Sequence, residues 1–502
     1  MNNCARTRIS YFLILQLNHL LCYMSKFKFC LMKPNVINIH IGKKIFFIIA
    51  FACFFKGFTQ KQKRPNFIVI LTDDQSWVGT SFLADPKDNR SKSDFYETPN
   101  MERLASMGMR LTNGYAPAPF CSPTRKSILT GLTPAKHEYQ KDRDNWTKVF
   151  RKEMTIPKIL KLADENYATA HFGKWDARYD QFTPEEMGYD FSDGLTGNNT
   201  GGGKSIIEIG DQEIPFAMGK EWPASYDDPK LIFDLTTRSN DFIEEQTKNN
   251  KPFFIQISHY AVHLAITHSE KSIDKYNNLR KGEKHFVPEF AAMTEDMDEG
   301  IGMILDKVEA LGILDNTYII FLSDNGGRSS IPIGKKQITP RNFPLRGGKG
   351  SMYEGGIRVP FVVVGPGVNK GSFSDVPITG LDLLPTLADL SGFNGVLPEK
   401  IDGGSIKEIL HNNGNGKVKR NSPYLIFHQA ANRKPKSAIR SGNFKLVKHW
   451  DEKMYELFDL SKDIEEKNDL SKELPEMVQE LDKELISFLY DANAEIIQNS
   501  KK

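Results

Sequence analysis

The chain of 502 residues is long enough to bury a large hydrophobic core, and one large domain with a smaller one is expected. Lysine and arginine number 66 against 63 aspartates and glutamates, but residues 1–60 hold eight of the bases and none of the acids. Without that segment the net charge is about −5, and a mildly acidic body without a basic run gives no reason to expect nucleic-acid binding.

Residues 1–60 have the composition of an export leader. Two lysines precede an apolar run at 45–55, as in the charged and hydrophobic regions of a signal peptide, and Met32 is the predicted true start. That run is too short for a helix to span a bilayer, so no stable membrane insertion is expected. The sequence therefore predicts an exported protein, periplasmic or secreted, in preference to a lipoprotein anchored at Cys53.

After the leader, short apolar runs alternate with amphipathic stretches. Strands are predicted at 65–71, 168–172, 252–258, 318–323 and 359–364. Helices are predicted at about 99–107, 156–164, 234–247, 289–311 and 381–390. This alternation predicts an α/β fold with a large, mostly parallel sheet sandwiched by helices.

The pattern changes near residue 395. Short strands are expected at 423–428, 436–439, 444–450 and 453–457, followed by a helix at about 475–490. We therefore predict a catalytic domain over residues 61–395 and a smaller C-terminal α+β subdomain with an antiparallel sheet over residues 396–502.

One cysteine remains after the leader, in the run Cys121-Ser-Pro-Thr-Arg-Lys-Ser-Ile-Leu-Thr-Gly131. Most such cysteines are small buried hydrophobes. Here Pro123 suits the first turn of a helix, which would place Cys121 at a helix N-terminus, where backbone N–H groups attract anions. Arg125, one turn on, would add a permanent positive charge. The run therefore predicts a nucleophile beside an anion-binding site.

One acidic pair and one pair of an acid and an amide stand where two of the predicted strands end. Asp73 and Asp74 follow the strand 65–71, and Asp324 and Asn325 follow the strand 318–323. Such pairs are also common in ordinary turns. Two adjacent charged carboxylates call for a cation, and hard oxygen ligands suit Ca²⁺ or Mg²⁺ and disfavour zinc.

Together, and in this order, these segments resemble the type I sulfatases, the formylglycine-dependent, arylsulfatase-like family of the alkaline phosphatase superfamily. The family signature is Cys-x-Pro-x-Arg followed by Thr-Gly, which residues 121–131 match. Further matches are Gly173-Lys174-Trp175, the run 258–263 ending in His263, and the block 346–360 around Lys349.

The resemblance implies a role for each matched residue. An enzyme that generates formylglycine would convert Cys121, and the hydrated aldehyde would be the nucleophile. One calcium ion would be held by Asp73, Asp74, Asp324, Asn325 and an oxygen of the modified Cys121. Arg125, Lys174 and Lys349 would hold the sulfate oxygens, and His263 would protonate the leaving alcohol.

The chain departs from the family pattern at one position. The family histidine after Gly-Lys-Trp is Asp176 in this sequence. Three interpretations stay open: Asp176 is the base of the second step, His171 or His259 replaces it, or turnover is impaired.

The predicted function is calcium-dependent hydrolysis of a sulfate ester on a carbohydrate, with algal polysaccharides as the expected source. The alternatives are a phosphoester or phosphonate hydrolase of the same superfamily, and a non-catalytic binder of sulfated glycans. Five residues are candidates to contact the sugar, on position and polarity: Arg143, Arg178, Asp180, His428 and Arg433.

Overall fold

In the computed structural model, the described part of the chain belongs to one unit, Lys63–Lys502. The described residues are 63–137, 150–176, 182–197, 206–209, 212–215, 227–264, 266–331, 341–429, 434–494 and 496. The predicted leader therefore lies outside the described residues, and so do Arg143, Arg178, Asp180 and Arg433. Within the part of the chain that is described, no helix is both long and apolar enough to cross a membrane.

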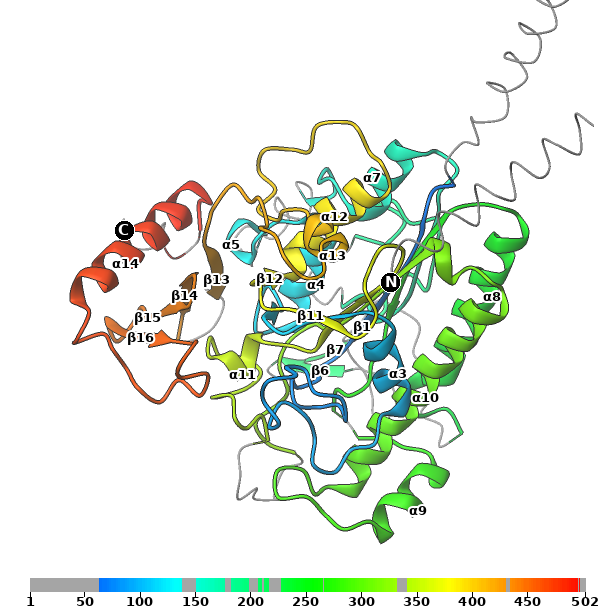
Figure 1. The fold of residues 1–502 in the computed structure, drawn as a ribbon, viewed down its shortest axis with the longest axis horizontal. Coiled ribbons are helices and arrows are strands. Elements are labelled where there is room, and N and C mark those ends of the chain that lie inside the picture. The colour runs from blue at the N-terminus through cyan, green and yellow to red at the C-terminus, as the bar shows by residue number, and fades with distance from the viewer. Residues whose placement is uncertain are drawn as a thin grey trace, which may run out of the picture. The chain divides into compact units, whose positions relative to one another are not determined.

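An eight-stranded sheet forms the centre of this unit (Figure 1). Its strands in spatial order are β11 (Ser372–Ser374), β2 (Met109–Leu111), β10 (Phe361–Val364), β9 (Thr317–Ser323), β1 (Asn66–Thr72), β8 (Phe253–Ser258), β4 (Ala168–Gly173) and β5 (Phe191–Ser192). β1 runs parallel to β9 and β8, and β4 runs parallel to β8 and β5. This arrangement confirms the predicted mostly parallel sheet, and it brings the carboxyl ends of four central strands to one edge.

β10 is the exception, because it pairs antiparallel with both β9 and β2. A parallel neighbour needs a crossover of a dozen or more residues, usually a helix. Between β9 and β10, the described residues contain only one short helix, α11 (Glu354–Ile357). The chain therefore turns back and enters β10 in the opposite direction.

Helices cover both faces of the sheet because successive side chains of each strand alternate between the faces. Ile68 and Ile70 of β1 pack in a core with α3 (Pro99–Met107), α8 (Ile232–Lys248) and α10 (Pro288–Ala310). Phe67, Val69 and Leu71 pack in a second core with α4 (Cys121–Thr130), α7 (Ile156–Ala163), α12 (Leu383–Leu390) and α13 (Lys407–His411). Every residue of β1, β8 and β9 is buried, as their continuous apolar runs predict.

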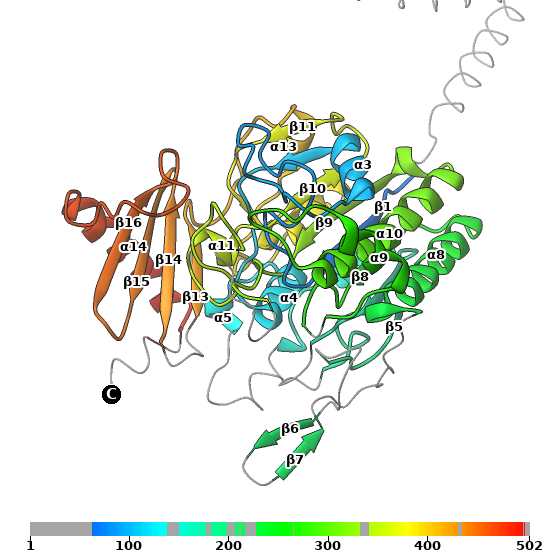
Figure 2. The ribbon, with the colours of Figure 1, turned by 90° about the horizontal axis from the view of Figure 1, so that it is seen from below.

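A second sheet follows near the C-terminus (Figure 2). β13 (Leu425–Gln429), β14 (Lys436–Ser441), β15 (Phe444–His449) and β16 (Met454–Asp459) pair antiparallel in that order. One face packs against α14 (Pro475–Asp491), and the other packs against Met352 and Ile357. The predicted antiparallel C-terminal sheet is confirmed. Ile401 and Ile409, which precede this sheet, pack in the core beside α12.

The remaining elements are short or peripheral. α9 (Glu270–Asn278) packs on α10, where Asp296 accepts hydrogen bonds from Ser269 and Ser272 at the start of α9. The others are α5 (Pro134–His137), the paired strands β3 (Gly114–Tyr115) and β12 (Ile378–Thr379), the hairpin of β6 (Ile206–Ile209) and β7 (Gln212–Pro215), and the 3-10 turns η1 (Pro229–Leu231), η2 (Leu314–Asn316) and η3 (Gly380–Asp382).

Candidate active site

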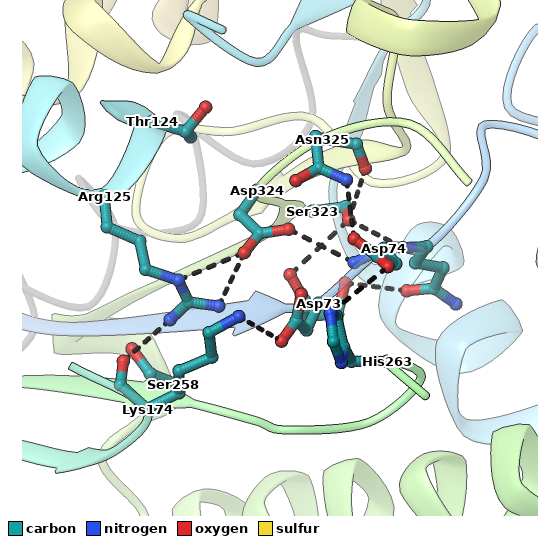
Figure 3. A network of polar contacts seen from close by, with 12 residues as sticks. Asp73, Asp74, Thr124, Arg125, Lys174, Ser258, His263, Ser323, Asp324 and Asn325 are labelled. Atoms are coloured by element: carbon teal, nitrogen blue, oxygen red, sulfur yellow. Dashed lines mark hydrogen bonds and ion pairs between the residues drawn. The ribbon is translucent and has the colours of Figure 1, made fainter. Parts of the chain in front are cut away.

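Four strand ends bring the site together (Figure 3). The register places Thr72 of β1 opposite Ser323 of β9, and Gly173 of β4 opposite Ser258 of β8. The polar residues that follow β1, β4, β8 and β9 therefore converge at one edge, the usual ligand position in open α/β sheets. Backbone bonds extend the sheet into these loops: the amide of Asp324 donates to the Thr72 carbonyl at 3.0 Å.

The first contact is a fully buried ion pair. Lys174 Nζ lies 2.6 Å from Asp73 Oδ2, and both side chains are 0% exposed. Although burial opposes ionisation, the positive charges of Lys174 and its neighbours hold the pKa of Asp73 well below its usual range. For the same reason, Asp73 keeps the pKa of Lys174 above its ordinary value despite burial. Both groups are therefore charged.

A second buried pair joins α4 to the end of β9. Arg125 Nε and Nη2 donate to Asp324 Oδ2 at 3.1 and 2.7 Å, and Nη1 donates to the Lys174 carbonyl at 2.8 Å. Burial and the neighbouring charge of Asp73 raise the pKa of Asp324 to about 7, although Arg125 opposes the rise. A bound metal ion would oppose this rise in the pKa of Asp324, because a nearby positive charge favours the ionised carboxylate.

Asp74 lies beside three further polar side chains, those of Asn325, Lys349 and His263. Asn325 Nδ2 donates to Asp74 Oδ1 at 2.8 Å, and Lys349 Nζ lies 2.6 Å from the same oxygen. His263 Nε2 lies 3.8 Å from Asp74 Oδ2, while His263 Nδ1 lies 2.6 Å from the Leu264 carbonyl oxygen. A proton on Nδ1 would be held by that carbonyl, so Nε2 is the nitrogen turned toward the site.

The oxygens of this cluster fit a hard cation. Asp73 Oδ1, Asp74 Oδ2 and Asn325 Oδ1 are buried and have no hydrogen-bond partner among the described residues. Potential ligand atoms of Asp73, Cys121 and Asp324 all lie within 4.8 Å of one another, as do those of Asp73, Asp74 and His263. Buried acceptors without partners cost free energy, and three carboxylates with an amide oxygen are the donor set of Ca²⁺ or Mg²⁺.

Cys121 begins helix α4, as the position of Pro123 predicts. Phe120 is extended and precedes the helix, Gly131 ends it with a left-handed φ of 68°, and every residue between them is buried. Burial, and then the charge of Asp176, raise the pKa of the Cys121 thiol to about 12. A thiol with such a pKa does not ionise near neutral pH and is a poor nucleophile as cysteine. This environment therefore does not favour a reactive thiolate at Cys121.

Asp176 lines a cavity with Ser122, the residue after Cys121, and its charge raises the pKa of the Cys121 thiol. It is buried, its φ is 62°, and its amide donates to the Thr196 carbonyl at 3.0 Å. With Arg125, Lys174 and Trp175 it lines this cavity beside the start of α4. Non-glycine residues in the left-handed region are uncommon, and they cluster where the surrounding structure holds them for function.

The two alternative histidines are held as neutral, weakly basic groups. Burial lowers the pKa of His171 to about 3 and that of His259 to about 4. His171 Nε2 lies 3.1 Å from Ser258 Oγ, and its ring packs edge-on against Trp175. An efficient base needs a pKa near the working pH, so these environments do not favour either histidine as the base.

His428 lies in β13 of the C-terminal sheet and not in the loops that follow β1, β4, β8 and β9. Its Nδ1 lies 2.8 Å from Ser437 Oγ, and burial lowers its pKa to about 4. Strand alternation places His428 on the face of Ile426, which packs against α14, whereas Phe427 on the opposite face packs toward Met352. Contact of His428 with a sugar stays a prediction.

One buried cation near the site was missed by sequence reasoning. Lys230 precedes α8, is 2% exposed and has a φ of 59°. Burial lowers its pKa to about 8, although the charges of Asp73 and Asp74 oppose that change. In sequence, Asp-Pro-Lys resembles an ordinary turn, and no local signal indicates that this lysine lies near the metal ligands.

Known proteins provide an independent comparison. A family model described as Sulfatase matches residues 65–393, and one described as N-sulphoglucosamine sulphohydrolase, C-terminal, matches residues 348–493. A sulfatase of Formosa agariphila is 26% identical over 494 residues, which cover 82% of this chain and 85% of the relative. An ulvan-active sulfatase of the same organism is 26% identical over 380 residues, which cover 70% of this chain and 65% of the relative.

A solved structure shares the fold. The crystal structure of Ps i-CgsB matches with a TM-score of 0.68 at 24% identity, covering 86% of this chain and 93% of that chain. The Sulfatase family model spans well over half of the present chain, from β1 to the end of α12. The chain therefore belongs to the sulfatase family and is a sulfuric ester hydrolase.

Proposed function

We propose that the protein is a calcium-dependent sulfatase that hydrolyses a sulfate ester of a polysaccharide or oligosaccharide. A formylglycine made from Cys121 by a maturating enzyme is part of the proposal, as is export to the periplasm or the medium. The observation that supports it most is the convergence of three carboxylates, three permanent cations and the start of α4 at one sheet edge.

The charge balance of the site favours an anionic ester. The side chains of Asp73, Asp74 and Asp324 are each within 2.7 Å of one cation, namely Lys174, Lys349 or Arg125. The two charges of each pair cancel. A divalent cation held by Asp73, Asp74, Asp324 and Asn325 would therefore leave the site with net positive charge. When present, the formylglycine supplies a hydrated aldehyde as nucleophile, and Ca²⁺ supplies positive charge beside the sulfate oxygens.

The overall reaction consumes water and gives an alcohol and inorganic sulfate, with cleavage of the bond between sulfur and the leaving oxygen. Arg125, Lys174 and Lys349 would hold the sulfate oxygens, and their fixed partners keep them in place before the substrate arrives. The imidazolium form of His263 would give its Nε2 proton to the leaving oxygen, while its Nδ1 proton stays with the Leu264 carbonyl. Asp176, buried beside Cys121, would accept the proton of the second step.

The experiment starts with protein made together with a maturating enzyme. Mass spectrometry of the peptide containing Cys121 reports the conversion to formylglycine. Turnover of an aryl sulfate is then compared with that of the matched aryl phosphate, before and after removal of calcium by a chelator. We expect conversion, sulfate turnover in preference to phosphate, and loss of activity on chelation. An unmodified thiol in active protein, or full activity of Cys121→Ala, would overturn the proposal.

The carbohydrate part of the proposal rests on the relative named as ulvan-active, which is 26% identical to this chain. A panel of defined sulfated oligosaccharides, including ulvan fragments, tests it by release of inorganic sulfate. Release from aryl sulfates without release from any sulfated saccharide would contradict it. Export is tested separately, by N-terminal sequencing of protein recovered from the periplasm and medium of the producing cells.

A further inference from the structure

The segment 346–358, between β9 and β10, carries Lys349 into the site. Lys349 Nζ lies 2.6 Å from Asp74 Oδ1. The Lys349 amide donates to the Gly327 carbonyl at 2.9 Å, which attaches the segment to the loop after β9. The Gly350 amide donates to the Pro119 carbonyl at 2.9 Å, which attaches it to the residues just before α4. The position of this segment therefore decides where the ammonium group lies.

The opposite side of the segment is held by the C-terminal sheet through a buried charge cluster. Lys445 Nζ of β15 lies 2.7 Å from Glu354 Oε1 and 2.6 Å from Glu466 Oε1. Glu466 Oε2 also accepts a hydrogen bond from the Glu354 amide at 2.7 Å. All three side chains are 0% exposed. Two carboxylates thus contact one ammonium group where water cannot compete, and Arg358 Nε lies 2.6 Å from Glu354 Oε2 in the same cluster.

A second connection lies at the start of the segment. Arg346 Nη1 donates to Glu456 Oε1 and to the Glu466 carbonyl, both at 3.0 Å. The guanidinium stacks on the Tyr353 ring at 3.8 Å, and Tyr353 Oη donates to Glu456. Both ends of the turn that contains Lys349 are therefore attached to residues of the C-terminal sheet and the loop that follows it.

The glycines after Glu354 extend this connection to the metal-binding loop. The amide of Gly326 donates to the Gly356 carbonyl at 3.0 Å, and a Cβ on Gly326 would meet the Gly355 carbonyl oxygen at 1.9 Å. Only glycine permits so close an approach. A shift of Glu354 would therefore move the backbone that packs against the residue following Asn325.

We propose that Lys445, Glu456 and Glu466 are positioning residues, through which the C-terminal sheet holds segment 346–358 so that Lys349 meets the sulfate group. This inference rests on the proposed function and deepens it. Buried ion pairs add little net stability compared with apolar replacements, but they define one geometry. A displacement of about 1 Å at a positioned group can cost on the order of 100-fold in rate.

The test uses full-length, formylglycine-containing protein and the variants Lys445→Met, Glu456→Gln and Glu456→Ala. Lys445→Met and Glu456→Ala should raise KM for an aryl sulfate about tenfold and lower kcat/KM by roughly 10 to 100-fold. Glu456→Gln keeps a hydrogen-bond acceptor for Arg346 and Tyr353 and should recover most of that loss. The matched control is Arg420→Met, which breaks the buried pair of Arg420 and Asp382, 2.5 Å apart and outside the segment, and should leave kcat/KM unchanged.

Titration of inorganic sulfate into the same proteins gives a readout that does not need turnover. We expect sulfate binding about tenfold weaker in Lys445→Met and Glu456→Ala than in wild type or Arg420→Met, with folding checked by circular dichroism. Folded variants with wild-type sulfate affinity and kcat/KM within twofold of wild type would overturn the inference. A wild type that binds sulfate with the expected pattern among variants but hydrolyses no sulfate ester would overturn the proposed function and support the positioning role.

Discussion

Replacement of Lys174 by methionine tests whether the acidic cluster binds a cation. Lys174 Nζ is 2.6 Å from Asp73 Oδ2, both side chains are fully buried, and Asp73 Oδ1 already lacks a hydrogen-bond partner among the described residues. Breaking a buried pair by removing one partner costs about 3–5 kcal/mol, since it leaves an uncompensated charge. In the presence of a chelator, Lys174→Met should therefore lower the free energy of unfolding by about that amount.

Calcium should reduce this difference. The variant site keeps every proposed ligand but lacks one competing positive charge, so it should bind Ca²⁺ more tightly than the wild-type site. Each tenfold gain in affinity adds about 1.4 kcal/mol to the free energy of unfolding at saturating calcium. We expect the gap between variant and wild type to narrow by about 1–3 kcal/mol when calcium replaces the chelator.

The assay is urea unfolding followed by circular dichroism, with chelator and with saturating calcium. The matched control is Arg420→Met, because Arg420 pairs with buried Asp382 and neither residue is among the proposed ligands of the ion. The control should lose the same free energy of unfolding in both conditions. A gap for Lys174→Met that is identical with and without calcium would refute the assignment of Asp73 as a ligand of the ion.

Three further outcomes are expected. His263→Gln should lower kcat about 100-fold or more on alkyl sulfates, because their leaving oxygen needs a proton, and much less on a nitrophenyl sulfate, whose leaving oxygen does not. Equal losses of kcat on both substrates would exclude His263 as the proton donor. Asp176→Asn should lower kcat at similar KM and Asp176→His should recover it, whereas undiminished turnover of Asp176→Asn would remove Asp176 from the mechanism. Burial lowers the pKa of His171 to about 3 and that of His259 to about 4, so the stability that each neutral ring contributes is present above an unfolded pKa near 6.5. As the pH falls toward 4, each contribution decreases by up to about 1.4 kcal/mol per pH unit. Urea unfolding between pH 7 and 5 should show that the free energy of unfolding depends less steeply on pH in a folded His171→Gln variant, and an unchanged dependence would contradict this assignment.

Local patterns in the sequence determined the elements and the identity of most site residues. The run 65–71 is apolar at nearly every position, which predicts a strand buried on both faces, and β1 has that burial. Pro123 predicts a helix that begins at Cys121, and α4 begins there. Polar residues directly after a predicted strand are expected at the ligand edge of an α/β sheet, and Asp73 and Asp324 both lie at that edge.

Contacts between distant segments depended on tertiary structure. The direction of β10, the orientation of His428 and the burial of Lys230 near the acidic cluster have no local signal. Nor does the sequence indicate that Lys445 bridges Glu466 to Glu354, which precedes Lys445 by 91 residues. Periodicity and turn residues specify how a segment folds and which face is buried, whereas the partner of a buried charge is decided by which other segments pack there.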